Sequence, residues 1–215
     1  MVYRRTQAVV TRLEDNRARI LAAARKLVAE GGWRHAHIAT VAESAGVATG
    51  TVYRYFPSKA ELFAEVLAIV SRRERDVIAA VVDGDGAPPV RMRGAVCAFA
   101  RRALRGRRLA YAMIVEPCEP EIDAARLEWR AALGEEFVRL IRIGQEQGAF
   151  RAGDARIAAA CVVGAFMEAL VGPLAPEAFA DERVADALID QIADACLAIV
   201  AKPPARATSR IGRIA

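Results

Sequence analysis

A short run of hydroxyl, aromatic and basic side chains has the chemistry of a surface that binds phosphates and bases. It consists of Thr49, Gly50, Thr51, Tyr53, Arg54 and Tyr55. Small polar residues at the start of a helix leave its first backbone N–H groups accessible, and the helix dipole favours an anion there. Long tyrosine and arginine side chains reach base edges or phosphates. We therefore expect this run to bind nucleic acid, with Arg54 reading bases.

Two short helices joined by a glycine turn are expected to hold this run in place. The first carries apolar residues at helical spacing, namely Ile38, Val41, Ala42 and Ala45,. Gly46 ends it, because a left-handed residue at a helix C-terminus is most readily glycine. The second begins near Ala48 and ends before Pro57, which cannot continue a helix. Two such helices form a helix-turn-helix, although the same residues also suit a surface hairpin without a binding role.

The segment from Ala45 to Leu62, AGVATGTVYRYFPSKAEL, resembles the signature of the tetracycline-repressor (TetR) family almost position for position. The resemblance extends back through Arg19-Ile20-Leu21, Ala23-Ala24, Leu27, Glu30 and Gly31, and it covers the first quarter of the chain. It departs at His37, where the family usually has a capping threonine or serine. The resemblance implies that Thr40, Thr49, Thr51, Tyr53, Tyr55 and Lys59 contact DNA, mostly at phosphates.

The positive charge of the chain is concentrated in its N-terminal segment. Residues 1–60 hold ten Lys and Arg against four Asp and Glu, a net charge of +6, whereas the whole chain of 215 residues carries +5. An excess of positive charge beside a helix-turn-helix is typical of an electrostatic footprint for phosphate. The remainder of the chain is close to neutral, so the binding surface is expected in the first sixty residues.

Composition favours a helical protein without enzymatic chemistry. Alanine is abundant and β-branched runs are few, which favours an all-α fold,. Apolar spacing and breaks along the chain predict about nine helices. The chain has no apolar run long enough for a membrane span and no signal peptide, so we expect a cytoplasmic protein. We find no nucleophile–base set, no phosphate-binding glycine loop and no cysteine or histidine spacing for a metal, and expect no cofactor. Glu116, Glu119, Glu121 and Asp123 are interpreted as a solvated turn.

Glycine and proline clusters divide the chain into a binding head and a second helical unit. Residues 1–60 form the expected DNA-binding domain, whose first helix runs from Asp15 to Glu30 after a non-helical arm at 1–13. A connector helix, 58–82, starts with the capping box Ser58 to Glu61. After the break at Asp83–Pro89, residues 88–202 form an effector-binding and dimerisation domain. Its helices are expected at 89–104, 107–115, 121–147, 155–170 (capped by Asp154) and 182–201 (capped by Asp181), followed by a basic tail at 203–215.

The last two helices are apolar on more than one face, which is typical of helices buried between layers or against another chain. The resemblance implies that they pair with their copies in a four-helix bundle, and a palindromic operator mirrors such a two-fold dimer. We therefore predict a homodimer. The predicted interface residues are Val162, Phe166, Leu188, Ile192 and Ile199.

Helical bundles hold ligands in apolar pockets between their helices. The large or polarisable residues of the second domain are the candidates to line one, and Glu168 is a carboxylate within an apolar helix. The predicted pocket residues are Phe99, Tyr111, Met113, Trp129, Phe137, Phe166 and Glu168. The expected effector is an apolar or amphipathic small molecule.

These expectations combine into a sequence-specific DNA-binding regulator, a repressor that an effector releases from a palindromic operator. Two alternatives stay open. One is a nonspecific DNA-coating protein, and the other is a small-molecule carrier whose DNA-binding head is vestigial. Selective binding of one DNA sequence distinguishes the regulator from both.

Overall fold

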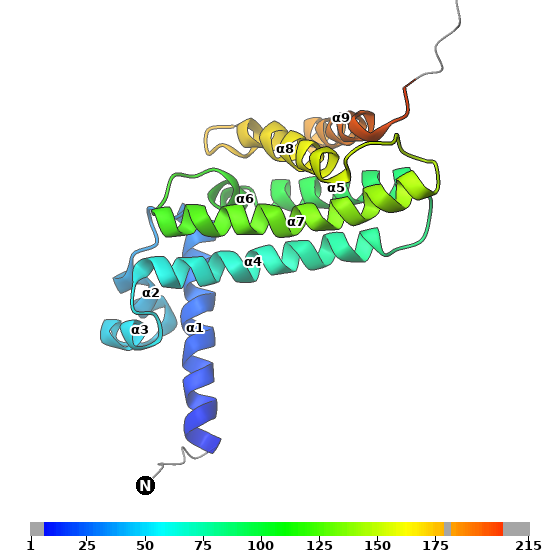
Figure 1. Cartoon of the computed structure of the whole chain (residues 1–215). Helices are drawn as coiled ribbons and strands as arrows, with labels where there is room; N and C mark the ends of the chain where they lie inside the picture. The colour runs from blue at the N-terminus through cyan, green and yellow to red at the C-terminus, as the bar shows by residue number, and fades with distance from the viewer. Residues whose placement is uncertain (1–6, 179–181, 204–215) are drawn as a thin grey trace, which may run out of the picture.

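The computed structural model of the chain describes residues 7–178 and 182–203, with the backbone alone at 7–12 and 182–184. Within these ranges the chain is all-α, as predicted, with nine helices and no strand (Figure 1). The helices are α1 (Gln7–Gly31), α2 (Ile38–Ala45), α3 (Thr49–Tyr55), α4 (Lys59–Val82), α5 (Pro88–Arg105), α6 (Arg107–Ile114), α7 (Pro120–Glu146), α8 (Ala155–Leu174) and α9 (Glu182–Val200). The predicted cap Asp181 and the predicted tail from 204 onward lie outside the described residues.

Two helices are longer than predicted. α1 begins at Gln7, so the arm expected at 1–13 is helical from Gln7 onward. Its first turns project away from the other helices (Figure 1), which explains why they carry no apolar stripe. α8 continues past Leu170 to Leu174 and includes Pro173 in its last turn. A proline there removes one backbone hydrogen bond, but it does not end the helix before Leu174.

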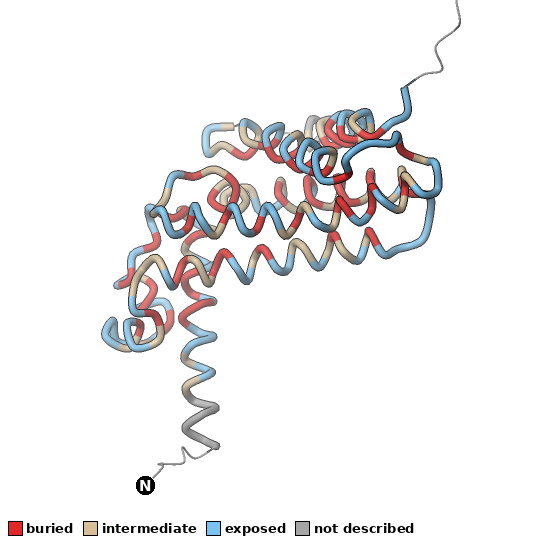
Figure 2. The backbone as a smooth tube through the Cα atoms, in the orientation of Figure 1, coloured by how far each residue is buried: buried red, intermediate tan, exposed pale blue. Residues whose placement is uncertain are grey.

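The helices of the bundle pack in layers, and the head lies at one end of the bundle. α4, α5 and α7 run lengthwise, and α8 and α9 pack on the side away from α4 (Figure 1). α1 descends steeply from this bundle and carries α2 and α3 on its flank. Buried residues follow the inner faces of the helices from the head into the bundle (Figure 2) and form one continuous hydrophobic core. A shared core means that head and bundle can influence each other through direct packing.

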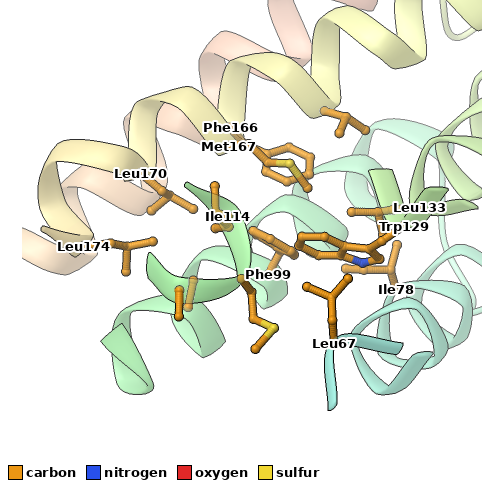
Figure 3. Packing of buried hydrophobic residues seen from close by; sticks show 14 of the residues in the cluster. Leu67, Ile78, Phe99, Ile114, Trp129, Leu133, Phe166, Met167, Leu170 and Leu174 are labelled. Carbon is orange, nitrogen blue, oxygen red and sulfur yellow. The ribbon is translucent and has the colours of Figure 1, made fainter. Parts of the chain in front are cut away.

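Aromatic rings fill the centre of the bundle (Figure 3). Phe99 of α5 lies between Trp129 of α7, at 6.5 Å between ring centroids, and Phe166 of α8, at 4.8 Å. Phe137 of α7 also packs against Phe166, at 5.6 Å between ring centroids. Such offset contacts add about 0.5–1.5 kcal/mol each beyond burial of the rings. The cluster therefore fixes α5, α7 and α8 relative to one another.

Local signals set the helix boundaries that position the site. Gly46 adopts φ 64°, and the backbone N–H of Val47 closes the end of α2 on the carbonyl of Ala42. The side chain of Ser58 accepts a hydrogen bond from the backbone N–H of Glu61 at 3.0 Å, as the predicted capping box requires,. Asp154 likewise caps α8 by accepting from the N–H groups of Arg156 and Ile157.

Candidate nucleic-acid interface and effector cavity

α2, the turn at Gly46 and α3 form the predicted helix-turn-helix on the flank of α1. Val52 is the buried anchor of α3, and Phe56 follows it into the core. His37 caps α2 with its backbone position only, since its side chain makes no capping hydrogen bond. The short helices thus depend on packing against α1 rather than on their own caps.

Two arginines of α1 brace this unit. Arg19 donates to the carbonyl of Ala45, at the end of α2, where an unpaired carbonyl would otherwise face outward,. Arg17 forms an ion pair with Glu65 of α4 at 3.2 Å and lies over the ring of Phe56. Sequence reasoning assigned neither arginine a role, although Arg19 belongs to the matched signature. Part of the positive charge of the head therefore holds the turn in place.

The predicted DNA-contact residues form an accessible edge at and around α3. Thr49, Gly50, Tyr53 and Arg54 are exposed, whereas Thr40, Thr51, Tyr55 and Lys59 are half-buried. A Cβ added at Gly50 meets nothing within 4 Å, so open space lies over the start of α3. Tyr55 also packs against the hydrophobic core. Figure 2 shows α3 as an exposed helix at the outer edge of the molecule.

Lys59 is engaged by the bundle. Its Nζ lies 3.0 Å from Oε1 of Glu119, in the loop between α6 and α7, and 5.6 Å from the ring centroid of Phe63. Burial is the largest single influence and raises the pKa of Glu119. The hydrogen bond from Lys59, a backbone hydrogen bond and the charge of Lys59 together outweigh burial and leave this pKa below its ordinary value,. A lysine predicted to hold a DNA phosphate is thus paired with a carboxylate of the other domain.

A buried polar junction joins the end of α1 to α6. The indole Nε1 of Trp33 donates to the carbonyl of Ala112 at 2.7 Å, and the backbone N–H of Trp33 donates to Glu116. Arg108 forms two hydrogen bonds with Glu116, at 2.7 and 3.1 Å, and a third with the carbonyl of Gly31. Glu116 is only 5% exposed, so its assignment to a solvated turn is wrong. The reason is Arg108, eight residues earlier, which supplies the cation that a buried carboxylate requires.

Arg126 reinforces the same junction from α7. It is 7% exposed and donates to the carbonyls of Ala112 and Glu116. Its guanidinium also pairs with Asp123 at 2.5 Å. Two buried charged side chains, Glu116 and Arg126, therefore fix the loop after α6 between the head and α7. That loop also carries Glu119.

Three of the seven predicted pocket residues line one cavity of about 80 Å³ between α4, α5, α6 and α7: Phe99, Met113 and Trp129. Tyr111, Phe137, Phe166 and Glu168 do not line it; Phe137 and Phe166 belong to the aromatic core behind it. Sequence reasoning missed Ser71, Glu74 and Arg102, which are its polar lining. Each lies in a polar helical stretch that is typical of a solvent-facing surface. Only the packing of the helices places these three side chains at the cavity.

A larger and more open groove of about 450 Å³ lies between α7 and α8. Its floor includes Val138, Val163 and Met167, and four charged residues line it: Arg130, Glu135, Arg156 and Glu168. Glu168 is exposed there, so the carboxylate needs no buried partner. Arg156 and Glu135 pair with each other across the groove at 2.6 Å.

The predicted interface residues face two ways. Val162, Phe166 and Ile192 are buried within the chain itself, where α8 and α9 pack on α5 and α7, and Leu188 and Ile199 are half-buried. The outward stripe of α8 consists of other residues, including Ile157, Cys161 and Gly164. α8 is long and apolar enough to cross a membrane by composition, with a mean hydropathy of 1.9, yet it packs in the bundle with 39% of that stretch buried. An apolar face of α8 is therefore left uncovered by the chain.

Comparison with known proteins identifies the head. Residues 20–66 match the family of bacterial regulatory proteins described as the tetR family. The transcriptional repressor KstR of Rhodococcus jostii is 47% identical over 55 residues, which are 26% of each chain. The match thus spans about a quarter of the length of this curated relative.

Solved structures resemble the whole fold. The regulator FadR of Bacillus subtilis, solved with stearoyl-CoA, superposes with a TM-score of 0.73 at 18% identity, over 85% of this chain and 98% of that one. RolR, solved with its ligand resorcinol, superposes with a TM-score of 0.67 at 26% identity, over 89% and 90% of the two chains. The signature, the helix-turn-helix geometry and the nine-helix fold of the described residues agree, and the head of this chain, residues 20–66, belongs to the tetR family of bacterial regulatory proteins.

Proposed function

We propose that this protein is a sequence-specific DNA-binding transcriptional regulator, a repressor that a small-molecule effector releases from a palindromic operator. The observation that carries this proposal is the exposed polar edge of α3, set on a helix-turn-helix whose other face is buried. Because the family is one of regulatory proteins, we propose no enzymatic activity.

In the proposed complex α3 lies in the major groove. Thr49 and Thr51 at its N-terminus bind phosphate, together with Thr40 and Lys59 at its two sides. Tyr53 and Arg54 are the long exposed side chains of α3, and Arg54 is the proposed base reader,. Gly50 permits close approach of the backbone, because nothing stands over its Cα.

The proposed active form is a homodimer that pairs α8 and α9 with their copies. The uncovered face of α8 supports this arrangement, because an apolar stripe of that length needs a cover in water,. A Cβ added at Gly164 meets nothing within 4 Å, which leaves room for a second helix to approach closely. The interface then uses Ile157, Cys161 and Gly164 on α8, with the half-buried Leu188 and Ile199 of α9 at its edge. Two recognition helices about 34–36 Å apart suit successive turns of DNA.

The polar junction supports a route from effector to head. Trp33 and Gly31 at the end of α1 bond to α6 and Glu116, and Lys59 at the start of α4 bonds to Glu119. An effector that shifts α4 or α6 therefore changes contacts at both ends of the helix-turn-helix. DNA affinity falls by the ratio of effector affinities for the two arrangements. The resorcinol complex of the related RolR supports a small organic effector.

Selection of bound sequences from random duplex DNA at near-physiological salt tests the proposal. We expect enrichment of one palindrome, and Arg54→Ala to relax the preference at its contacted positions. Arg142→Ala, which removes an exposed arginine from α7 in the bundle, is the matched control and should leave the selected sequence unchanged. Binding without enrichment would favour the nonspecific coating protein, and absence of salt-dependent binding would favour the carrier.

A further inference from the structure

Two buried polar groups have no hydrogen-bond partner, and both line the cavity of about 80 Å³ between α4, α5, α6 and α7. Among the described side chains, four polar atoms are buried without a partner: Ser71 Oγ, Trp129 Nε1, Arg91 Nε and Arg126 Nε. The two arginines bond through other nitrogens of the same group. Ser71 and Trp129 make no side-chain hydrogen bond, and they are 7% and 6% exposed.

This coincidence is informative because an unpartnered buried polar group costs about 1–3 kcal/mol. Either group could have been an apolar residue of similar shape without that cost. Both stand on facing helices, Ser71 on α4 and Trp129 on α7, and Figure 3 shows the indole nitrogen on the side of the ring that faces Leu67 and Ile78 of α4. The remaining lining is mostly apolar and includes Phe99, Met113 and Ile114.

The chemistry of the two groups defines which ligand atom would satisfy both of them. An indole N–H only donates, whereas a serine hydroxyl both donates and accepts. One oxygen that accepts from Trp129 and bonds to Ser71 satisfies both groups at once. A hydroxyl or a carbonyl oxygen meets this requirement.

The charged pair beside the cavity argues for a neutral occupant. Arg102 holds Glu74 through two hydrogen bonds of 2.7 and 2.8 Å, so each charge is already compensated. A charged ligand would have to separate this pair or be buried without a counterion, and both are costly. The volume argues against a long chain, because an engineered apolar cavity of about 150 Å³ is filled by a single benzene ring.

We propose that this cavity is the effector site and that its ligand is a compact, uncharged ring molecule carrying one hydroxyl or carbonyl oxygen, held by Trp129 Nε1 and Ser71 Oγ. The proposal rests on the proposed function for its regulatory meaning. The ring stacks in the apolar lining beside Phe99. Since about 80 Å³ is less than a ring requires, the ligand selects a state in which the four helices stand further apart,.

The test measures binding of four probes to the full-length protein by calorimetry: phenol, cyclohexanone, toluene and benzoate. Phenol and cyclohexanone should bind about tenfold more tightly than toluene, which has the ring without the oxygen. Benzoate should bind more weakly than phenol because it carries a charge.

Two variants locate the oxygen. Ser71→Ala and Trp129→Phe should each weaken phenol binding relative to toluene binding, roughly threefold to tenfold. Ser71→Ala should not lower the melting temperature of the ligand-free protein, because it removes only a polar atom that has no partner. Trp129→Phe also removes buried ring volume beside Phe99, so it should lower the melting temperature,. Ser44→Ala, at an exposed serine of α2, is the matched control and should change neither quantity.

Equal affinity for phenol and toluene would overturn the inference, as would tighter binding of benzoate. Loss of melting temperature in Ser71→Ala without any phenol binding would also overturn it, since the two groups would then hold structural water. The operator selected above separates the two proposals. A protein that selects an operator but binds no probe refutes only this inference, and one that binds phenol but selects no DNA refutes only the proposed function.

Discussion

The head and the bundle place their polar groups in opposite ways. In the head, Tyr53 and Arg54 point outward and the buried residues are apolar, so its polar chemistry is presented to something outside the chain. In the bundle, three polar or charged residues are buried among the side chains that the structure describes, namely Ser71, Glu116 and Arg126. A surface of the first kind suits a large partner that approaches from solvent. An interior of the second kind suits either internal bracing or a small molecule that is enclosed.

The bundle interior itself contains both cases. Glu116 and Arg126 are fully engaged between helices and loop, so they brace the junction with the head. Ser71 and Trp129 are equally buried but unengaged. Satisfied polar groups specify a structure, whereas unsatisfied ones can pair with a ligand or an ordered water. Four predictions test this contrast, from the largest expected effect to the smallest.

Gly164→Leu should give the largest effect, because it adds bulk to the outer face of α8 and nothing within the chain opposes it. We expect a folded monomer by sedimentation and a loss of operator affinity of a hundredfold or more, since two linked contacts become one. Ala68→Leu adds the same kind of bulk to an exposed position of α4, on the opposite side of the bundle, and should leave the dimer intact.

Cys161 provides a second readout of the same variant. It is exposed in the chain but lies on the proposed interface, whereas Cys97 and Cys196 are buried, with burial raising the pKa of Cys196 to about 11. Iodoacetamide at pH 8 should therefore modify Cys161 in Gly164→Leu and spare it in the wild type. Rapid modification of Cys161 in both proteins would place the interface elsewhere.

Arg108→Met should cost about 3 kcal/mol of unfolding free energy, because it leaves Glu116 buried without its cation,. For a chain of this size that corresponds to a fall of roughly 6–12 °C in melting temperature. Arg105→Met, at an exposed arginine three residues earlier, is the control and should change stability little. An unchanged melting temperature in Arg108→Met would show that the junction does not brace the head.

Lys59→Ala should weaken operator binding roughly tenfold, because it removes one phosphate contact. The slope of log affinity against log salt should fall by about one unit, equally on all sequences. Filter binding at several salt concentrations measures both. A changed sequence preference with an unchanged slope would remove Lys59 from the phosphate contacts.

Glu119→Gln should have the smallest effect and the opposite sign. It releases Lys59 from a half-exposed ion pair, so operator affinity should rise about twofold,. The pKa of Glu119 is lowered from its ordinary value of 4.5, so the pair contributes stability above that pH and loses it as pH falls through the lowered pKa,. Between pH 6 and 8 the effect of the variant should therefore be constant. A decrease in affinity would mean that Glu119 positions Lys59 for DNA instead of competing for it.

The same contrast explains what the sequence could reveal. The head was predictable because its signals are local: Gly46 ends one helix, Ser58 and Glu61 start another, and apolar spacing sets the buried face. The cavity was only partly predictable. Ser71 stands in the polar run Ser71-Arg72-Arg73-Glu74, which resembles a solvated helix face. The other residues that line the cavity come largely from α5, α6 and α7, which are distant in sequence.

Burial of Glu116 was missed for the same reason. Its environment is supplied by Arg108 and by Trp33, eighty-three residues away, and spacing along the chain carries no trace of that contact. Three of the predicted interface residues lie on the inward faces of α8 and α9, because α8 is apolar around most of its circumference and periodicity cannot choose between its faces.

The unbroken course of α4 has a geometric consequence. Ser71 in the cavity and Lys59 beside the helix-turn-helix are twelve residues apart on this one helix, about 18 Å along its axis,. A rotation of about 5° pivoting at Ser71 displaces Lys59 by about 1.6 Å. In a two-fold dimer both copies rotate, so the separation of the recognition helices changes by as much as about 3 Å against a half-site spacing of about 34 Å. A ligand ring that opens the cavity rotates α4 by only a small angle. The length of α4 amplifies this rotation into a mismatch between the spacing of the recognition helices and the helical repeat of DNA.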